Sequence, residues 1–158
     1  MPNWCEGTLK VRGTKENLIK FLKNNFTPVT WLGSDVKAEF VEEKYSVALK
    51  CDEKFHGFHV KGTRRNFIET NCIEFEFWDD DKETHVMVIE NYKAAWGIDA
   101  APLAEISKEF YVDLKIYAYE RGMEFNQDIE IIDGEIVKNE EINFDDYMWE
   151  CAHPSIGG

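Results

Sequence analysis

The fold is decided by residues 96–122, which read WGIDAAPLAEISKEFYVDLKIYAYERG. Pro102 suits the first turn of a helix, because its missing N–H would have no partner there in any case. Just before it, the carboxylate of Asp99 can accept a hydrogen bond from the free amides of that turn. The apolar positions of this helix follow at i, i+3 and i+7: Leu103, Ile106 and Phe110.

After this helix the hydrophobic period changes to two, which predicts a strand that follows almost without a loop. One face of the strand is apolar, with Val112, Leu114, Ile116 and Ala118. The other face carries Asp113, Lys115, Tyr117 and Tyr119. Gly122 ends the strand.

Length and composition indicate one folded domain over residues 1–158, since 44% of the residues are hydrophobic and 14% are aromatic. No apolar run approaches the ~20 residues needed to cross a bilayer, so we expect no membrane association. For the same reason, and because residues 1–10 do not have a basic region followed by an apolar core, we expect a cytoplasmic protein. The cysteines are far apart in sequence and form no C-x-x-C pair, so in a reducing cytosol we expect free thiols. They are Cys5, Cys51, Cys72 and Cys151.

The net charge of −13 is unevenly distributed along the chain. Residues 1–33 carry five positive and two negative side chains, whereas residues 123–158 carry one positive and ten negative. A polyanion is repelled by phosphate backbones, so nucleic-acid binding is disfavoured unless a local basic patch overrides the total. A protein partner with a basic surface is the better match.

Before the central stretch, the pattern predicts a strand at residues 5–12 and a helix at residues 14–25 with Thr14 as N-cap. Residues 27–66 carry only short, weak patterns, and we interpret them as an insertion. Residues 73–77 and 86–90 alternate in the manner of two strands, which predicts a hairpin. Its turn holds Asp79, Asp80, Asp81 and Lys82.

After the central stretch, Asp133-Gly134 is a strong hairpin signal within residues 123–142, and we expect the tail, residues 143–158, to be frayed. Without the insertion and this extra hairpin, the element order is βαββαβ. That order predicts an α+β ferredoxin-like two-layer sandwich, in which two helices cover one face of an antiparallel sheet.

Three motifs resemble a known family: Pro2-Asn3-Trp4-Cys5 with Leu9-x-Val11-x-Gly13, Trp96-Gly97 before Pro102, and Tyr119-Glu120-x-Gly122-x-x-Phe125. In these the chain is similar to the YubB or Api92-like family of small proteins encoded by phages, plasmids and integrated mobile elements. The resemblance implies a ferredoxin-like domain in a mobile-element setting and therefore the cytosol of a host. It supplies no catalytic residue, and "ferredoxin-like" refers to topology, not to an iron–sulfur cluster.

A zinc site is the main metal candidate, because Cys51, His56 and His59 offer thiolate and imidazole ligands, with Cys72 as a distant fourth. The alternative is an irregular loop around Gly57 in which the histidines gather by chance, and we prefer it. The three aspartates at 79–81 could hold Mg²⁺ or Ca²⁺, but a solvated turn explains them as well. We expect no metal and no cofactor.

The sequence has no nucleophile elbow, no Walker loop and no dinucleotide-binding fingerprint, so we do not expect an enzyme. The five tryptophans could form a ligand wall, although we expect them in the core or at its rim. They are Trp4, Trp31, Trp78, Trp96 and Trp149.

A nucleic-acid-binding accessory protein is the alternative function. Two neighbouring guanidinium groups beside Phe67 could clamp phosphates while the ring stacks on a base. Against this, the same arginines can pair with the chain's many carboxylates. The basic residues of this hypothesis are Lys10, Arg12, Lys15, Lys20, Arg64 and Arg65.

The acidic tail gives the preferred hypothesis, because carboxylates and large apolar side chains alternate there. Such anchors supply affinity for a basic groove while the charges steer the encounter. We therefore expect a non-enzymatic protein-binding accessory protein, an acidic inhibitor of a host defence nuclease that mimics nucleic acid, of the anti-CRISPR or anti-restriction type. The alternative is that the apolar residues only fix the tail to the domain. The predicted binding residues are Glu140, Glu141, Phe144, Asp145, Asp146, Tyr147 and Trp149.

Overall fold

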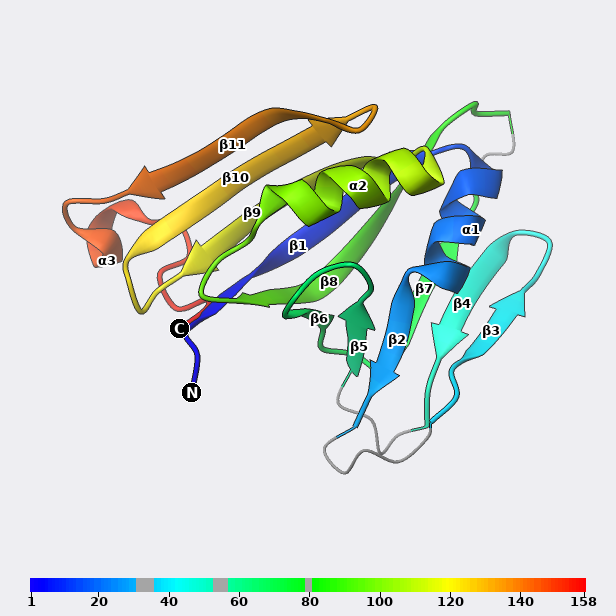
Figure 1. Ribbon diagram of the computed structural model, residues 1–158, viewed down its shortest axis with the longest axis horizontal. Coiled ribbons are helices and arrows are strands. Elements are labelled where there is room, and N and C mark those ends of the chain that lie inside the picture. Colours follow the sequence, from blue (N-terminus) through cyan, green and yellow to red (C-terminus); the bar gives the residue numbers. More distant parts are fainter. Residues whose placement is uncertain (31–35, 53–56, 79–80) are drawn as a thin grey trace.

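The computed structural model describes residues 1–30, 36–52, 57–78 and 81–158, and within them the protein is mostly β-structure (Figure 1). The strands are β1 (Trp4–Gly13), β2 (Phe26–Val29), β3 (Glu39–Glu42), β4 (Ser46–Lys50), β5 (Gly57–Val60), β6 (Asn66–Ile68), β7 (Cys72–Glu76), β8 (His85–Ala95), β9 (Asp113–Glu120), β10 (Phe125–Ile132) and β11 (Glu135–Asn143). The helices are α1 (Lys15–Asn24), α2 (Ala100–Phe110) and α3 (Tyr147–Glu150).

The main sheet has eight antiparallel strands in the order β11-β10-β9-β1-β8-β6-β5-β2. The first strand of the chain therefore lies near its centre, with Val11 opposite Met87 of β8 on one side and Leu114 of β9 on the other. A second sheet has the order β3-β4-β7.

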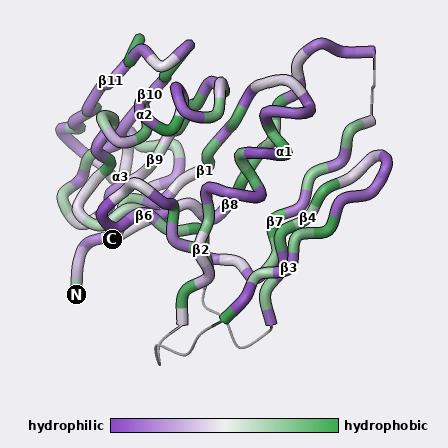
Figure 2. Tube along the Cα trace, turned by 45° about the vertical axis from the view of Figure 1, so that its right-hand side comes forward, coloured by the Kyte–Doolittle hydropathy of each residue, from purple (hydrophilic) through white to green (hydrophobic). Residues whose placement is uncertain are grey.

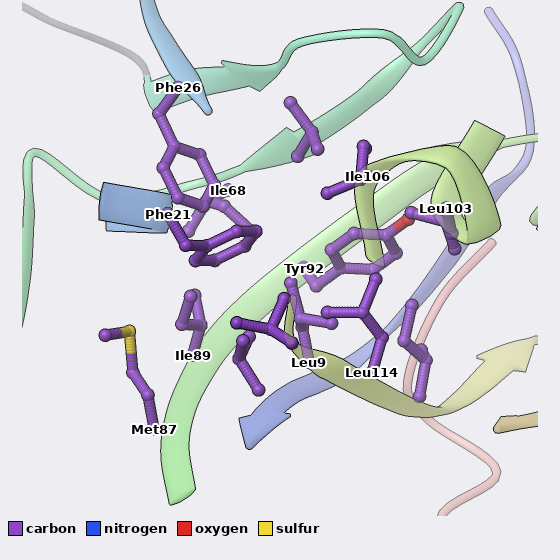
Figure 3. Packing of buried hydrophobic residues seen from close by; sticks show 14 of the residues in the cluster. Leu9, Phe21, Phe26, Ile68, Met87, Ile89, Tyr92, Leu103, Ile106 and Leu114 are labelled. Carbon is purple, nitrogen blue, oxygen red and sulfur yellow. The ribbon is translucent and has the colours of Figure 1, made fainter. Parts of the chain in front are cut away.

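The core lies between one face of the main sheet and the helices α1 and α2 (Figure 3). Leu9 and Leu114 point from the sheet toward Phe21 of α1 and Leu103 of α2, as the period-two alternation predicts. The opposite face of β1 and β9 carries their polar residues and is not covered by α1 or α2; we call it the open face, and the C-terminal tail covers part of it. Both predicted helices are confirmed, and Thr14 and Asp99 are their N-caps.

The predicted ferredoxin-like arrangement is wrong, because β7 and β8 do not form a hairpin. β7 pairs with β4 in the small sheet, where Phe75 lies opposite Val47 and Ile73 opposite Leu49. β8 instead pairs with β1 and β6. The apolar face of β7 fits the equally apolar β4, whose Val47, Ala48 and Leu49 are buried.

The interpretation of residues 27–66 as an insertion is also wrong, since these residues build both sheets. β2, β5 and β6 complete one side of the main sheet, whereas β3 and β4 supply two of the three strands of the small one. Between β2 and β8 the chain thus passes twice from the main sheet to the small sheet, and its second return is β8 itself. These strands have only three to five residues each, so their sequence pattern is short.

The hairpin of β10 and β11 is confirmed, with positive φ at Asp133 (51°) and Gly134 (75°) in its turn. The tail that follows is not frayed, which corrects the prediction for residues 143–158. Tyr147 and Cys151 are buried, and the N–H of Gly158 donates to the carbonyl of Trp4 at 2.8 Å.

None of the helices within the described ranges combines the length and the apolar character that crossing a lipid bilayer requires.

Candidate functional site

The acidic tail is held on the open face of the main sheet by a buried polar network around Asn126 of β10. The hydroxyl of Tyr147 donates to Oδ1 of Asn126 at 2.9 Å, and Nδ2 of Asn126 donates to the Tyr117 hydroxyl at 3.1 Å. The Cys151 thiol lies against the same amide, with Sγ 3.5 Å from Nδ2. These contacts fix the inner side of the tail.

The network also shifts the acidities of its members. Burial raises the pKa of the Cys151 thiol, but hydrogen bonds from Asn126, Tyr147 and the backbone at His153 outweigh burial and lower this pKa overall. Burial, and then the hydrogen bond to Cys151, raise the pKa of Tyr147. Since the Cys151 side chain is buried, the network serves to anchor the tail and does not present a nucleophile.

The outer side of the same segment presents an exposed tryptophan. Trp149 of α3 is 86% exposed, and its backbone N–H donates to the capping carboxylate of Asp146 at 3.2 Å. Glu150 closes the turn by accepting from the N–H of Asp146 at 2.8 Å, and the rings of Phe144 and Tyr147 meet edge to face. The short helix therefore has a defined orientation.

Carboxylates gather where β11 leads into α3, and we call this region the acidic end. Within the described part of the chain, none of its carboxylates forms an ion pair with a lysine or arginine. Unpaired charges at one end of a molecule of net charge −13 produce a negative potential that attracts cations. The acidic end comprises Glu140, Glu141, Phe144, Asp145, Asp146, Met148, Trp149 and Glu150. Of the predicted binding residues, Tyr147 alone faces inward.

The basic residues of the alternative hypothesis are divided between two sides of the molecule. Lys10 and Arg12 lie on the open face of β1, whereas Lys15 and Lys20 belong to α1, which covers the opposite face. Arg12 pairs with Asp113 at 2.7 Å. The structure therefore does not gather these four cations into one patch.

The remaining basic pair lies before β6. The guanidinium of Arg65 is 5.8 Å from the ring of Trp4, beside Lys93 at 4.8 Å, and Arg64 is exposed. This cluster borders the open face but is separate from α1.

The candidate zinc ligands are divided between the two sheets. Cys51 and Cys72 lie near each other in the small sheet, where Cys72 pairs with Lys50 and the N–H of Cys51 donates to the carbonyl of Asn71. Cys51 follows β4 in the small sheet, whereas His59 is on β5 of the main sheet with Nε2 3.0 Å from the Thr63 carbonyl. His56, Asp79 and Asp80 lie outside the described residues. Among the residues that the structure does describe, no three His, Cys, Asp or Glu side chains are placed to hold a metal ion.

The tryptophans do not form a common wall in the described ranges. Trp4 is partly buried, whereas Trp78, Trp96 and Trp149 are exposed, so these three do not belong to the expected core. Trp31 lies outside the described residues.

The sequence analysis did not predict a cavity of about 630 Å³ on the open face of the sheet. Hydroxyl and ammonium groups of β1 and β9 line it together with the carboxylates of Glu6 and Glu90, and the docked tail closes one side. The polar face of residues 113–119 is the part of the sequence that indicated this cavity. The contribution of the tail to its lining could not be inferred, because we expected the tail to be frayed. Its lining includes Thr8, Lys10, Lys115, Tyr117, Tyr119 and His153.

Comparison with protein-family models, with curated proteins and with solved structures finds no match.

Proposed function

We propose that this protein is a non-enzymatic binding protein whose acidic end docks on a basic surface of a protein partner. The observation that carries the proposal is the exposed Trp149, held on a capped helix among carboxylates that have no lysine or arginine partner in the described residues. An exposed aromatic anchor with surrounding charges is the arrangement that concentrates binding energy at protein interfaces.

The docked tail supports this proposal through preorganisation. Because Tyr147 and Cys151 already fix the inner side, little further ordering is required when the outer side binds. The unpaired carboxylates accelerate encounter with a basic partner and oppose encounter with nucleic acid.

We propose as partner class a host defence nuclease, whose nucleic-acid groove is basic by necessity. The acidic end would occupy this groove in place of a phosphate backbone and so inhibit the nuclease. The mobile-element setting that the family resemblance implies supports this choice. Direct nucleic-acid binding is less well supported, because the basic residues lie on different sides of the sheet.

A pull-down from host lysate, with and without nuclease treatment, tests the proposal. The test variant combines Glu140→Gln, Asp145→Asn and Trp149→Ala, none of which removes a side-chain hydrogen bond of the described residues. The matched control combines Glu74→Gln, Glu76→Gln and Trp78→Ala in the small sheet and the segment that follows it, since Trp78 is 88% exposed.

We expect the wild-type protein and the control to retain the same protein partner after nuclease treatment, and the test variant to lose it at least tenfold. The affinity of the retained partner should fall as salt is raised. If the two variants retain the partner equally, or if nuclease treatment releases it from the wild-type protein, the proposal is wrong.

A further inference from the structure

We propose that β11 is a docking strand, to which the partner adds an extended basic segment as a ninth strand of the main sheet. This inference rests on the proposed function and specifies how the partner binds at the acidic end. Four features of the described residues support it.

The first feature is the difference between the two edges of the main sheet (Figure 1). One edge is β2, which has only four residues and contains Pro28, a residue without a backbone donor. The other edge is β11, which has nine residues and no proline. Short strands and prolines protect edges from further pairing, and β2 has both. β11 has neither of these, and its own edge carries charged side chains and one register shift at Val137.

The second feature is the free hydrogen-bonding side of β11. Among the described residues, β11 forms a backbone ladder only with β10, from Glu135 opposite Ile132 to Asn143 opposite Phe125. The register shifts once, at Val137, and the pairing is regular from Lys138 to Asn143. In an antiparallel strand, alternate residues direct both N–H and C=O away from the first neighbour. These outward groups can bind an added strand, as in other complexes that extend a sheet at its edge.

The third feature is the side-chain composition of this edge, which is mostly hydrophilic (Figure 2). Val137 is 56% exposed, and Glu135, Glu140 and Glu141 lie along the same strand without a lysine or arginine partner in the described ranges. The one cation of the strand, Lys138, turns back to Asp128 at 2.9 Å. Lysines and arginines that alternate with β-branched residues would complement such an edge.

These charges also decide against a second copy of the chain. In a pair of β11 strands, the carboxylates of one copy would face those of the other, and each copy carries a net charge of −13. Like charges opposite each other destabilise strand pairing. A basic segment of another protein is therefore the favoured occupant.

The fourth feature is continuity with the proposed anchor. β11 ends at Asn143, and only three residues separate it from α3, which carries Trp149. A strand added along β11 would end beside this tryptophan, so backbone pairing and side-chain anchoring would belong to one surface.

The probe is a synthetic eight-residue peptide in which lysine and valine alternate. A second peptide has the same sequence but carries N-methyl groups on four consecutive backbone nitrogens, which keeps its charge and removes ladder donors. We expect the methylated peptide to bind at least tenfold more weakly by fluorescence anisotropy. Amide hydrogen exchange should slow at alternate residues of β11 when the unmodified peptide binds.

A variant of the protein provides an independent test. Val137→Lys places a cation on the docking strand and should weaken binding of the lysine–valine peptide at least fivefold. Val88→Lys is the matched control, because Val88 is 49% exposed on the open face of β8. Circular dichroism of both variants should match that of the wild-type protein, which shows that any loss of binding does not come from unfolding.

Equal binding of both peptides without protection of β11 would overturn the docking strand, while the proposed function would stand if the acidic-end variant still lost its partner in the pull-down. The proposed function itself would be contradicted by a different result, namely a pull-down in which the acidic-end variant still retains the partner. Concentration-dependent dimerisation through β11, measured by sedimentation, would also overturn the inference.

Discussion

The Cys5 thiol is buried at the centre of the main sheet, with Sγ donating to Oε1 of Gln127 at 3.6 Å. Burial, and then the charges of Glu120 and Glu6, raise the pKa of this thiol to about 12. In the unfolded chain the same thiol ionises near its ordinary value of about 9. Because the pKa is higher in the folded state, folding loses stability as pH rises above the unfolded value.

We therefore predict that the wild-type protein loses about 1 kcal/mol more of its free energy of unfolding between pH 8 and pH 10 than Cys5→Ser does. The serine hydroxyl retains a donor toward Gln127 and does not ionise in this range. Urea denaturation at both pH values measures the difference. Equal losses for the two proteins would mean that Cys5 does not stay protonated in the fold.

At the scale of elements, the helix α1 depends on its N-cap. Oγ1 of Thr14 accepts from the N–H of Asn17 at 3.2 Å, which satisfies one of the free amides at the start of the helix. We predict that Thr14→Ala lowers the free energy of unfolding by about 1 kcal/mol. Urea denaturation measures it, with Thr84→Ala as the control at an exposed threonine outside the helices. If Thr84→Ala lowered the free energy of unfolding by a similar amount, the loss in Thr14→Ala could not be attributed to the N-cap.

Elements with local signals could be predicted from the sequence. The helices have a 3.6-residue period and a capping residue within a few positions, and the β10–β11 turn has Asp133-Gly134. The pairing of β7 could not be predicted, because its alternation fits any apolar strand. Whether β7 pairs with β4 or with β8 depends on which apolar strand lies beside it in the folded protein. The sequence alone does not show this.

The same distinction applies to the candidate site. The carboxylates and Trp149 of the acidic end follow from composition, since charge is a property of the sequence itself. Composition does not show which apolar residues of the tail face inward. Tyr147 faces inward because it is anchored by Asn126, twenty-one positions earlier in the chain. The exposed edge of β11 could be predicted only with the full strand order.

At the scale of the whole molecule, the docked tail contributes to stability as well as to binding. Deleting residues 144–158 would uncover Asn126 and remove the buried Tyr147 and Cys151. We predict that this deletion lowers the free energy of unfolding by about 3 kcal/mol, of which roughly 2 come from apolar burial and about 1 from the hydrogen bond. Urea denaturation monitored by circular dichroism measures the change. An unchanged midpoint would show that the tail is not docked in solution.

The central position of β1 has a consequence for synthesis on the ribosome. Its two neighbours, β8 and β9, are translated long after it: the partners of Val11 are Met87 and Leu114, which lie far along the chain. Until those codons are read, the nascent chain carries an alternating apolar strand with no native neighbour, and pairing over such separations is slow. The growing polypeptide therefore carries β1 as an unpaired apolar strand until at least residue 85 has been added, and this interval favours aggregation.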